Sequence, residues 1–361
     1  MNHNNVEVRN YILDVVNFWI DEFDLDGIRL DAADVLNFQF MKDLRKLCDS
    51  KKNDFWLMGE VIHGDYTRWV NNEMLESVTN YSLHKALYSG MNTNNFFEIA
   101  HTVKRIEGMG LSYLYNFLDN HDVERIYTKL DNKNYFIPVN VMLYTLPGIP
   151  SIYYGSEFGI EGKKERGSDY SLRPYLNLDD YKNNKYEEVF KRLNKIKNES
   201  LILSYGKYKE LVLKNKVFAY ERVLDNNQII IVVSNDDNDN IVTIDNPYHD
   251  KYVGIMSSNV IYKSDNKLIV NVKSCSADIY ISNGYDDIKA IDIKIENKKK
   301  EEVRVRIDVP NKPLEEMNID ELHQVILDKM AKNGNVTDYM KKTVYDNNHK
   351  PSLINWAKSF R

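Results

Sequence analysis

The sequence predicts an α/β protein built on a parallel sheet, followed by an antiparallel all-β domain. Up to residue 202, short apolar runs alternate with segments of helical periodicity, which is typical of βαβ units. From about residue 203, apolar and polar residues alternate one by one, which is typical of half-buried strands. The 361 residues are enough for two or three domains at roughly 100 to 200 residues each.

The α/β part is predicted to begin with a helix over Val6–Phe23. Its apolar side chains recur at helical spacing after Asn4 and Asn5, which are good N-cap residues. Five apolar runs are predicted as strands, at 25–31, 55–60, 74–79, 113–119 and 149–155. Further helices are predicted at 35–47, within 80–107, within 134–145 and at 181–197.

The all-β part is predicted from alternating runs separated by Asn, Asp, Ser and Pro. These runs lie at 217–223, 228–234, 241–245, 252–256, 267–272 and 277–282, with a turn at 225–227 between the first two. The sequence therefore predicts three parts: 1–202, 203–284 and 285–361. In the last part we expect a solvated Lys-rich run at 298–302, a strand at 302–308 and a capped helix from Asn318 to Lys332.

Composition excludes several functional classes. The formal net charge of −6 provides no basic surface for nucleic acid or anionic membrane, so neither is an expected partner. Cys48 and Cys275 are too far apart in sequence to form a CxxC motif, no histidine has zinc-ligand spacing, and no metal or cofactor is predicted. The longest apolar stretch, 139–154, is too short to span a bilayer, and the first residues lack the pattern of a secretory signal. We expect a cytoplasmic protein.

Carboxylates follow four of the five predicted strands. They are Asp31, Glu60, the pair Asp119 and Asp122, and Glu157. Each one alone is more typical of a helix N-cap or of a loop than of a catalytic residue. The carboxyl ends of parallel strands meet around one mouth in β/α folds, however, so the set predicts an acidic site there.

Two of these carboxylates have environments that point to opposite protonation states. Arg29 lies two residues before Asp31 on the same strand face, so its charge favours the ionised carboxylate that a nucleophile needs. Glu60 follows the apolar run 55–58, which favours the protonated form that a general acid needs. Such a pair is the requirement for retaining glycoside cleavage. The alternative for Arg29 is a structural ion pair with Asp31 or Asp34.

At these residues the chain resembles a known family. The segments 26–34 (DGIRLDAAD), 59–64 (GEVIHG), 117–122 (FLDNHD) and 148–157 (GIPSIYYGSE) look like the ordered motifs at strands four, five, seven and eight of the α-amylase family of glycoside hydrolases. The resemblance covers roughly residues 1–283. It implies an incomplete (β/α)8 TIM barrel (strands four to eight), then an antiparallel sandwich domain. Residues 285–361, outside the resemblance, are expected to form a mostly helical C-terminal extension. Strands one to three, with the motif on strand three, are expected to be absent.

The resemblance also implies a role for each matching residue. Asp31 matches the nucleophile, and Arg29 matches the residue that holds it ionised and oriented. Glu60 matches the acid/base. Asp122 matches the third carboxylate, which stabilises the transition state, and His121 matches a histidine that binds the same sugar.

Further positions resemble the cyclomaltodextrinase and neopullulanase-like branch of the family. Asp169 and Arg173 have the spacing of an Asp and an Arg that bind the next sugar in that branch, although a loop ion pair is an equal alternative. His63, Tyr66 and Trp69 follow Glu60 and are interpreted as a leaving-side sugar platform. For Trp69, packing in the core is at least as good an interpretation.

The leading functional hypothesis is a retaining hydrolase of α-1,4-glucans such as maltodextrins, starch or cyclodextrins. We expect the chain alone to be weakly active or inactive, because an open barrel lacks part of its site. Open sheet edges also favour self-association or a complementary N-terminal half as partner. The alternatives are a non-catalytic glucan-binding or interaction fragment, and a transglycosylase of the same family.

Overall fold

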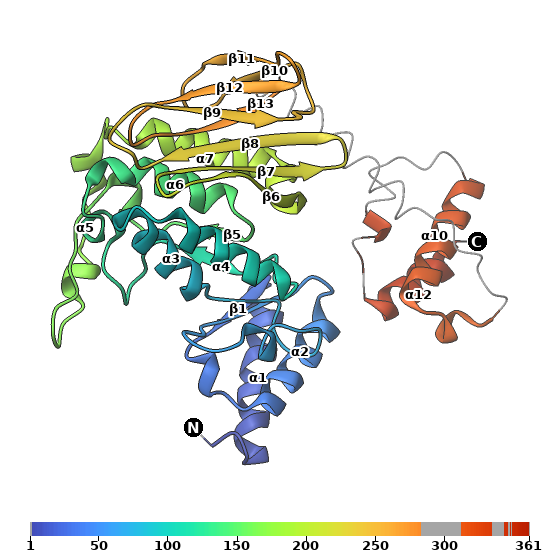
Figure 1. Cartoon of the computed structure of the whole chain (residues 1–361). Helices are drawn as coiled ribbons and strands as arrows, with labels where there is room; N and C mark the ends of the chain where they lie inside the picture. Colours follow the sequence, from blue (N-terminus) through green and yellow to red (C-terminus); the bar gives the residue numbers. More distant parts are fainter. Residues whose placement is uncertain (1, 283–311, 334–342, 346, 348, 361) are drawn as a thin grey trace. The chain divides into compact units, whose positions relative to one another are not determined.

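The computed structural model describes residues 2–282, 312–333, 343–345, 347 and 349–360 (Figure 1). The chain forms two compact units, Met1–Asp292 and Ile293–Arg361. The first unit contains the predicted parallel and antiparallel strands. The second contains helices in its described residues.

All five predicted parallel strands are confirmed. They are β1 (Gly27–Leu30), β2 (Trp56–Gly59), β3 (Ser77–Val78), β4 (Tyr115–Phe117) and β5 (Ile149–Ser151). Pairing follows the order β1-β2-β3 in one sheet and β4-β5 in another, and a single parallel bridge between Thr79 and Tyr115 joins the two. Within the described residues, β1 pairs only with β2 and β5 pairs only with β4, so both ends of this arc have a free edge.

The helices of the α/β part are α1 (Val6–Phe23), α2 (Phe38–Lys51), α3 (Tyr81–Asn92), α4 (Phe96–Gly108), α5 (Ile126–Lys129), α6 (Phe136–Thr145), α7 (Glu187–Glu199) and α8 (Leu201–Tyr205). The sequence missed the two short helices α5 and α8, and its single helical segment within 80–107 is the two helices α3 and α4. Asparagine side chains cap α1, α2 and α3 by accepting a backbone N–H at Glu7, Phe40 and Leu83. The predicted start of a helix at 181 is wrong: α7 begins at Glu187, because Asn183 adopts a left-handed φ of 61° that interrupts the helical backbone.

Helix α1 buries little of its apolar surface. Only Val16 and Ile20 are fully buried, whereas Tyr11 is 71% exposed and Phe18 and Trp19 are also exposed. A helix usually packs such side chains against the core. The outer side of α1 therefore presents an uncovered apolar face next to the free edge strand β1.

The all-β part forms two antiparallel sheets. Its strands are β6 (Lys207–Leu213), β7 (Val217–Leu224), β8 (Asn227–Ser234), β9 (Asn240–Asp245), β10 (Lys251–Gly254), β11 (Val260–Tyr262), β12 (Lys267–Val272) and β13 (Ala277–Ile281). One sheet has the order β11-β10-β13-β8-β7-β6, and β12 pairs with β9 in the other. The sequence predicted six of these strands and missed β6 and β11.

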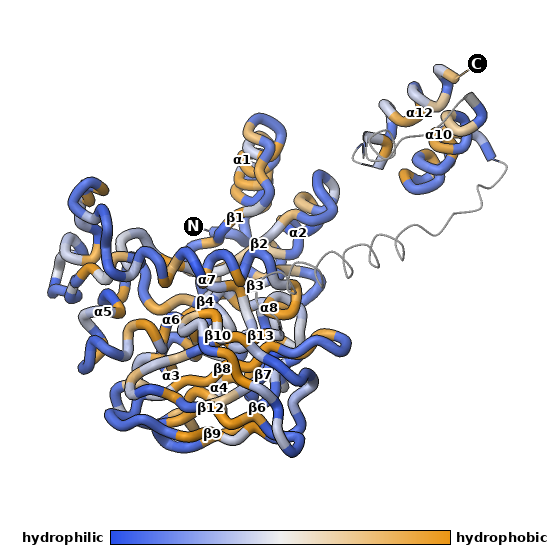
Figure 2. Tube along the Cα trace, turned by 90° about the horizontal axis from the view of Figure 1, so that it is seen from above, coloured by the Kyte–Doolittle hydropathy of each residue, from blue (hydrophilic) through white to orange (hydrophobic). Residues whose placement is uncertain are grey.

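Apolar residues fill both faces of the larger sheet. Strands β7 and β8 are hydrophobic along most of their length (Figure 2). On one face, Val217, Ala219 and Val232 pack with residues of β9 and β12 to form the core between the sheets. On the other face, Phe218 contacts Phe96 of α4 with ring centroids 5.9 Å apart, and this face belongs to the core of the α/β part. A continuous core thus fixes the sandwich against the helices.

The second unit contains α10 (Ile319–Asn333) and α12 (Lys350–Ser359). The predicted cap of α10 is confirmed: the backbone N–H of Glu321 donates to the Asn318 side chain, and the Glu321 carboxylate accepts from the Asn318 N–H. Buried side chains shared by these helices include Leu322, Ile326 and Leu353. The predicted run 298–302 and strand 302–308 lie outside the described residues. In the part of the chain that the structure describes, no helix has the length and apolar character needed to cross a membrane.

Candidate active site

Arg29 and Glu60 form an ion pair between neighbouring strands. Arg29 lies on β1 beside Met58 of β2, and Glu60 directly follows β2, where its backbone N–H donates to the Leu30 carbonyl. Nη2 of Arg29 is 2.9 Å from Oε2 of Glu60. The interpretation of Arg29 as an ion-pair partner of Asp31 or Asp34 is therefore wrong, because its guanidinium reaches across to the next strand.

Asp31 nevertheless has the ionised character that the sequence predicted. A hydrogen bond with the Glu60 carboxyl is the main cause that lowers its pKa, and the positive charge of Arg29 and interaction with His121 lower the pKa further. Glu60 and Arg29 thus surround Asp31 with groups that favour its ionised form. Asp31 itself is exposed, in the turn that follows β1.

Tyr81 connects Glu60 to the next part of the site. Its hydroxyl donates to Oε1 of Glu60 at 3.3 Å and accepts from the amide of Asn120 at 3.3 Å. Burial is the main cause that raises the pKa of Tyr81, so the hydroxyl keeps its proton. Oδ1 of Asn120 in turn accepts the backbone N–H of Asp122 at 2.8 Å. Sequence reasoning missed Tyr81 and gave Asn120 no role, although Asn120 lies inside a quoted motif.

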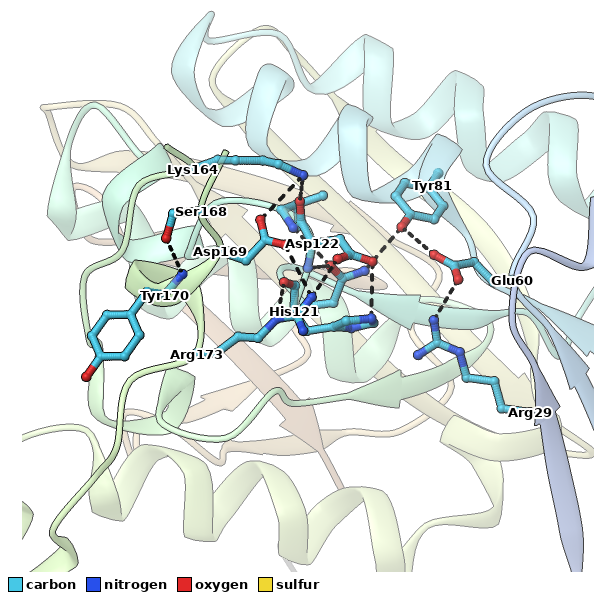
Figure 3. A network of polar contacts seen from close by, with 12 residues as sticks. Arg29, Glu60, Tyr81, His121, Asp122, Lys164, Ser168, Asp169, Tyr170 and Arg173 are labelled. Carbon is cyan, nitrogen blue, oxygen red and sulfur yellow. Dashed lines mark hydrogen bonds and ion pairs between the residues drawn. The ribbon is translucent and has the colours of Figure 1, made fainter. Parts of the chain in front are cut away.

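The predicted residues after β4 and β5 come together in one network, which Figure 3 shows. Oδ1 of Asp122 is 3.0 Å from Arg173, and Oδ2 is 3.1 Å from Nε2 of His121. Arg173 also pairs with Asp169 at 3.4 Å and donates from Nε to the His121 carbonyl at 3.1 Å. Lys164 donates to the Asp122 carbonyl at 2.8 Å. Asp169 and Arg173 thus form an ion pair within the loop, as one of the two interpretations from the sequence predicted; the other was that they bind a sugar.

Two buried residues hold the loops that carry this network. Asp119 accepts hydrogen bonds from the Ser156 hydroxyl at 2.7 Å and from the Ile126 N–H at 2.8 Å, and burial raises its pKa. Arg125 is fully buried and donates to the carbonyls of Tyr154 at 2.6 Å and Leu172 at 2.8 Å. These bonds fix the segment before Arg173, so Asp119 and Arg125 have structural roles.

The remaining predicted residues lie apart from the network. Tyr66 and Trp69 are buried at 2% and 3% exposure, so their interpretation as a sugar platform is wrong, and the alternative for Trp69, packing in the core, is confirmed. The Tyr66 hydroxyl is instead 3.2 Å from Ser82 Oγ, at the start of α3. His63 is exposed in the loop after β2, and Glu157 lies in a single turn after β5 with one buried oxygen that has no partner among the described residues.

Asp31 and Asp122 lie on an open surface rather than in a cavity, whereas Glu60 is buried at 7% exposure. Asp31 is exposed, and the side chains of Arg29 and Asp122 are each 37% exposed. A cavity of about 640 Å³ lies elsewhere, in the sandwich, and is lined by Asn240, Asn271 and other residues of its strands. Among the described residues, no group of three or more His, Cys, Asp or Glu side chains is placed to hold a metal ion.

Comparison with known proteins finds related sequences and a related fold. Residues 1–199 match the family model described as the catalytic domain of α-amylase. A cyclomaltodextrinase from Thermoanaerobacter pseudethanolicus is 28% identical over 253 residues, which are 66% of this chain and 42% of that protein. An intracellular maltogenic amylase from Bacillus subtilis is 30% identical over 241 residues, which are 64% of this chain and 40% of that protein. The chain thus spans about two fifths of the length of these relatives.

Solved structures show the same fold. The structure of an α-amylase from Anoxybacillus superposes with a TM-score of 0.72 at 23% sequence identity. The matched region covers 78% of this chain and 64% of that one. It therefore extends beyond the α/β part into the antiparallel sandwich.

Proposed function

Since the chain belongs to the α-amylase family of glycoside hydrolases, we propose that it acts on α-1,4-glucans such as maltodextrins, starch or cyclodextrins by a retaining mechanism. In this proposal its α/β part corresponds to strands four to eight of a (β/α)8 barrel. The observation that carries the proposal is the pair formed by Asp31 and Glu60 after β1 and β2, in which the hydrogen bond with Glu60 and the charge of Arg29 lower the pKa of Asp31. In the proposed mechanism Asp31 is the ionised nucleophile and Glu60 is the acid. One ionised and one protonated carboxyl group are what double displacement requires.

The proposed reaction has two steps. Asp31 attacks the anomeric carbon and forms a covalent glycosyl ester, while Glu60 gives its proton to the departing glycosidic oxygen. Glu60 then takes a proton from water, and the water oxygen attacks the same carbon and releases Asp31. Arg29 favours both steps, because its guanidinium orients Glu60 at 2.9 Å and its charge favours the ionised form of Asp31.

The network around Asp122 is the proposed sugar-binding part of the site. Asp122 and His121 offer an acceptor and a donor to hydroxyls of the ring that is cleaved. Arg173 and Asp169 lie next to them and are proposed to bind the neighbouring sugar. An α-glucan oligosaccharide is neutral, so it fits a surface whose positive and negative side chains are already paired with one another. His63 is proposed as a contact on the leaving side.

Exposure of the site limits its expected rate. Preorganised charges act most strongly where water is excluded, and Arg29 and Asp31 both face solvent. We therefore expect weak cleavage by the chain alone.

The apolar face of α1, with Tyr11, Phe18 and Trp19, supports association with a second copy or with a complementary segment. Sedimentation at increasing concentration tests this, and Trp19→Lys should weaken the association. The cytoplasm is the proposed location.

Reducing-sugar release from maltotriose tests the catalytic proposal. The wild-type chain should release sugar slowly, and Asp31→Asn and Glu60→Gln should each abolish the release while the thermal transition is retained. Asp34→Asn is a matched control, because Asp34 is exposed and near Asp31 in sequence. A release rate that survives Glu60→Gln contradicts the proposal.

A second candidate function is glucan binding without cleavage. The open position of Asp31 and Arg29 favours it, because binding tolerates solvent exposure better than catalysis does. Calorimetric titration with maltotriose that gives heat, from a chain that releases no sugar, supports this alternative. Transglycosylation uses the same carboxylates, and product analysis separates it from hydrolysis by the appearance of oligosaccharides longer than the substrate.

A further inference from the structure

A separate cavity lies at the opposite end of the parallel strands. It has a volume of about 300 Å³. The lining comes from the end of α4, the segments before β4 and β5, α8, β6 and β7, and consists of Glu107, Ser112, Tyr113, Pro147, Ser204, Tyr205, Gly206, Lys207, Tyr208 and Arg222. Because Tyr113 and Pro147 precede their strands, this cavity opens at the amino ends, whereas the carboxylate network lies at the carboxyl ends.

The floor of the cavity carries a rigid cationic group. Arg222 is fully buried, and it donates from Nε and Nη2 to the Gly206 carbonyl and from Nη1 to the Thr145 carbonyl. These bonds fix the guanidinium plane and use three of its five N–H donors. Burial lowers the pKa of Arg222 to about 10, so it remains charged at neutral pH. It can therefore present donors in a fixed direction.

Acceptor and donor groups line the same cavity as Arg222. Glu107 is half-buried, burial raises its pKa, and within the described residues it has no ion-pair partner closer than 4 Å. The hydroxyl of Tyr208 is buried and has no hydrogen-bond partner in the described part of the chain. A buried hydroxyl without a partner is unfavourable, and a ligand that supplies one relieves it.

The rim of the cavity carries two exposed aromatic rings. Tyr113 is 48% exposed and Tyr205 is 49% exposed. Their ring centroids are 6.3 Å apart at an angle of 66°. Exposed tyrosine rings next to hydrogen-bonding groups suit a ligand that has one apolar and one polar side, because the ring face packs against C–H groups.

These groups select a neutral polyhydroxylated ligand. An anion would lie against Glu107, and a cation would lie against Arg222, whereas sugar hydroxyls both donate and accept. The C–H face of a pyranose ring fits the tyrosine rings. A volume of about 300 Å³ is at the lower limit for small-molecule sites, which suits one or two sugar rings.

We propose that this cavity is a second saccharide site, which binds the end of an α-glucan oligosaccharide through Glu107, Tyr208, Arg222 and the ring of Tyr113. The choice of glucose units rests on the proposed function. The cavity itself is independent of the carboxylate network, because the two sites share no residue. The site holds a glucan end at the amino ends of the strands while another chain is bound at the carboxyl ends.

Equilibrium dialysis with maltotriose tests this site. The wild-type chain should bind two molecules, and Tyr208→Phe and Tyr113→Ala should each weaken one of the two binding events about tenfold or more, as expected for the loss of a buried hydrogen bond or a ring contact. Tyr208→Phe removes only a hydroxyl without a partner, so its melting temperature should be unchanged or higher. Tyr262→Phe and Tyr262→Ala are matched controls, because Tyr262 is exposed on β11 outside the cavity.

The outcomes separate this proposal from the proposed function. Asp122→Ala should weaken only the other binding event. Unchanged binding in both Tyr208→Phe and Tyr113→Ala overturns the second site, whether the wild-type chain binds one molecule or two. A third outcome is that Tyr208→Phe and Tyr113→Ala abolish all maltotriose binding, whereas Asp122→Ala leaves it intact. This outcome supports the second site and counts against the proposed function.

Discussion

The Tyr81 hydroxyl donates a hydrogen bond to Oε1 of Glu60 at 3.3 Å. Tyr81 begins α3, and its ring packs edge-on against Phe117 of β4 with centroids 4.9 Å apart. The same hydroxyl accepts from Asn120, which is two residues before Asp122. Tyr81 therefore links the proposed acid/base to the loop of the third carboxylate.

Tyr81→Phe should lower kcat/KM for maltotriose by up to about tenfold, since a hydrogen bond between neutral groups contributes about 0.5–1.5 kcal/mol. The ring packing is retained, so the thermal transition should change little. Steady-state rates measure the effect, with Tyr88→Phe on the same helix as control. Equal rates for Tyr81→Phe and wild type would show that the hydroxyl does not position Glu60.

Arg173→Ala should reduce kcat/KM strongly, because Arg173 contacts Asp122, Asp169 and the His121 carbonyl at once. Its side chain is 46% exposed, so the free energy of unfolding should fall by no more than about 1 kcal/mol. Arg173→Lys should not restore the rate, since an ammonium lacks the planar fork that reaches three acceptors. Arg166→Ala, an exposed change in the same loop, is the control. Recovery of the rate in Arg173→Lys would reject a geometric role.

Arg125→Met should destabilise the protein by about 3 kcal/mol, because it leaves the buried carbonyls of Tyr154 and Leu172 without donors. Urea denaturation measures this change. An exposed substitution such as Arg166→Met should stay within about 0.5 kcal/mol of wild type. If the two variants have the same midpoint, the buried bonds of Arg125 do not stabilise the loop.

His84 should make stability depend on pH. Burial, and then the positive charge of Lys129, lower its pKa from 6.5 to about 4 in the folded chain. The folded state thus prefers neutral His84, so this contribution is fully present above pH 6.5 and is lost as the pH falls toward 4. The loss should approach about 3 kcal/mol. His84→Phe keeps the stack on Phe117 and should flatten the dependence, and an equally steep profile in that variant would assign it to other groups.

Local sequence signals predicted the parallel strands and most of the site, because short apolar runs that end in a carboxylate are strong patterns. Strand β6 was missed because its residues do not alternate: Lys207, Lys209 and Glu210 make its first half mostly charged, and its last three residues are all apolar. Strand β11 was missed because it has only three residues. Tyr81 was missed because its contact with Glu60 arises from the curvature of the sheet. Tyr66 was misinterpreted, and Trp69 was left with two interpretations, because sequence does not show to which side the loop after β2 folds.

The parallel strands of the α/β part form two sheets, and a single bridge between Thr79 and Tyr115 joins these two halves. Glu60 belongs to the half with β1–β3, and Asp122 belongs to the half with β4 and β5. Besides this bridge, side chains join the halves: the Asn80 amide donates to Asn116 at 2.8 Å. The halves can therefore behave as separate cooperative units, and amide exchange should reveal subglobal opening between them before global unfolding. Each opening separates the acid from its third carboxylate, so heating should abolish catalysis before it removes the secondary structure.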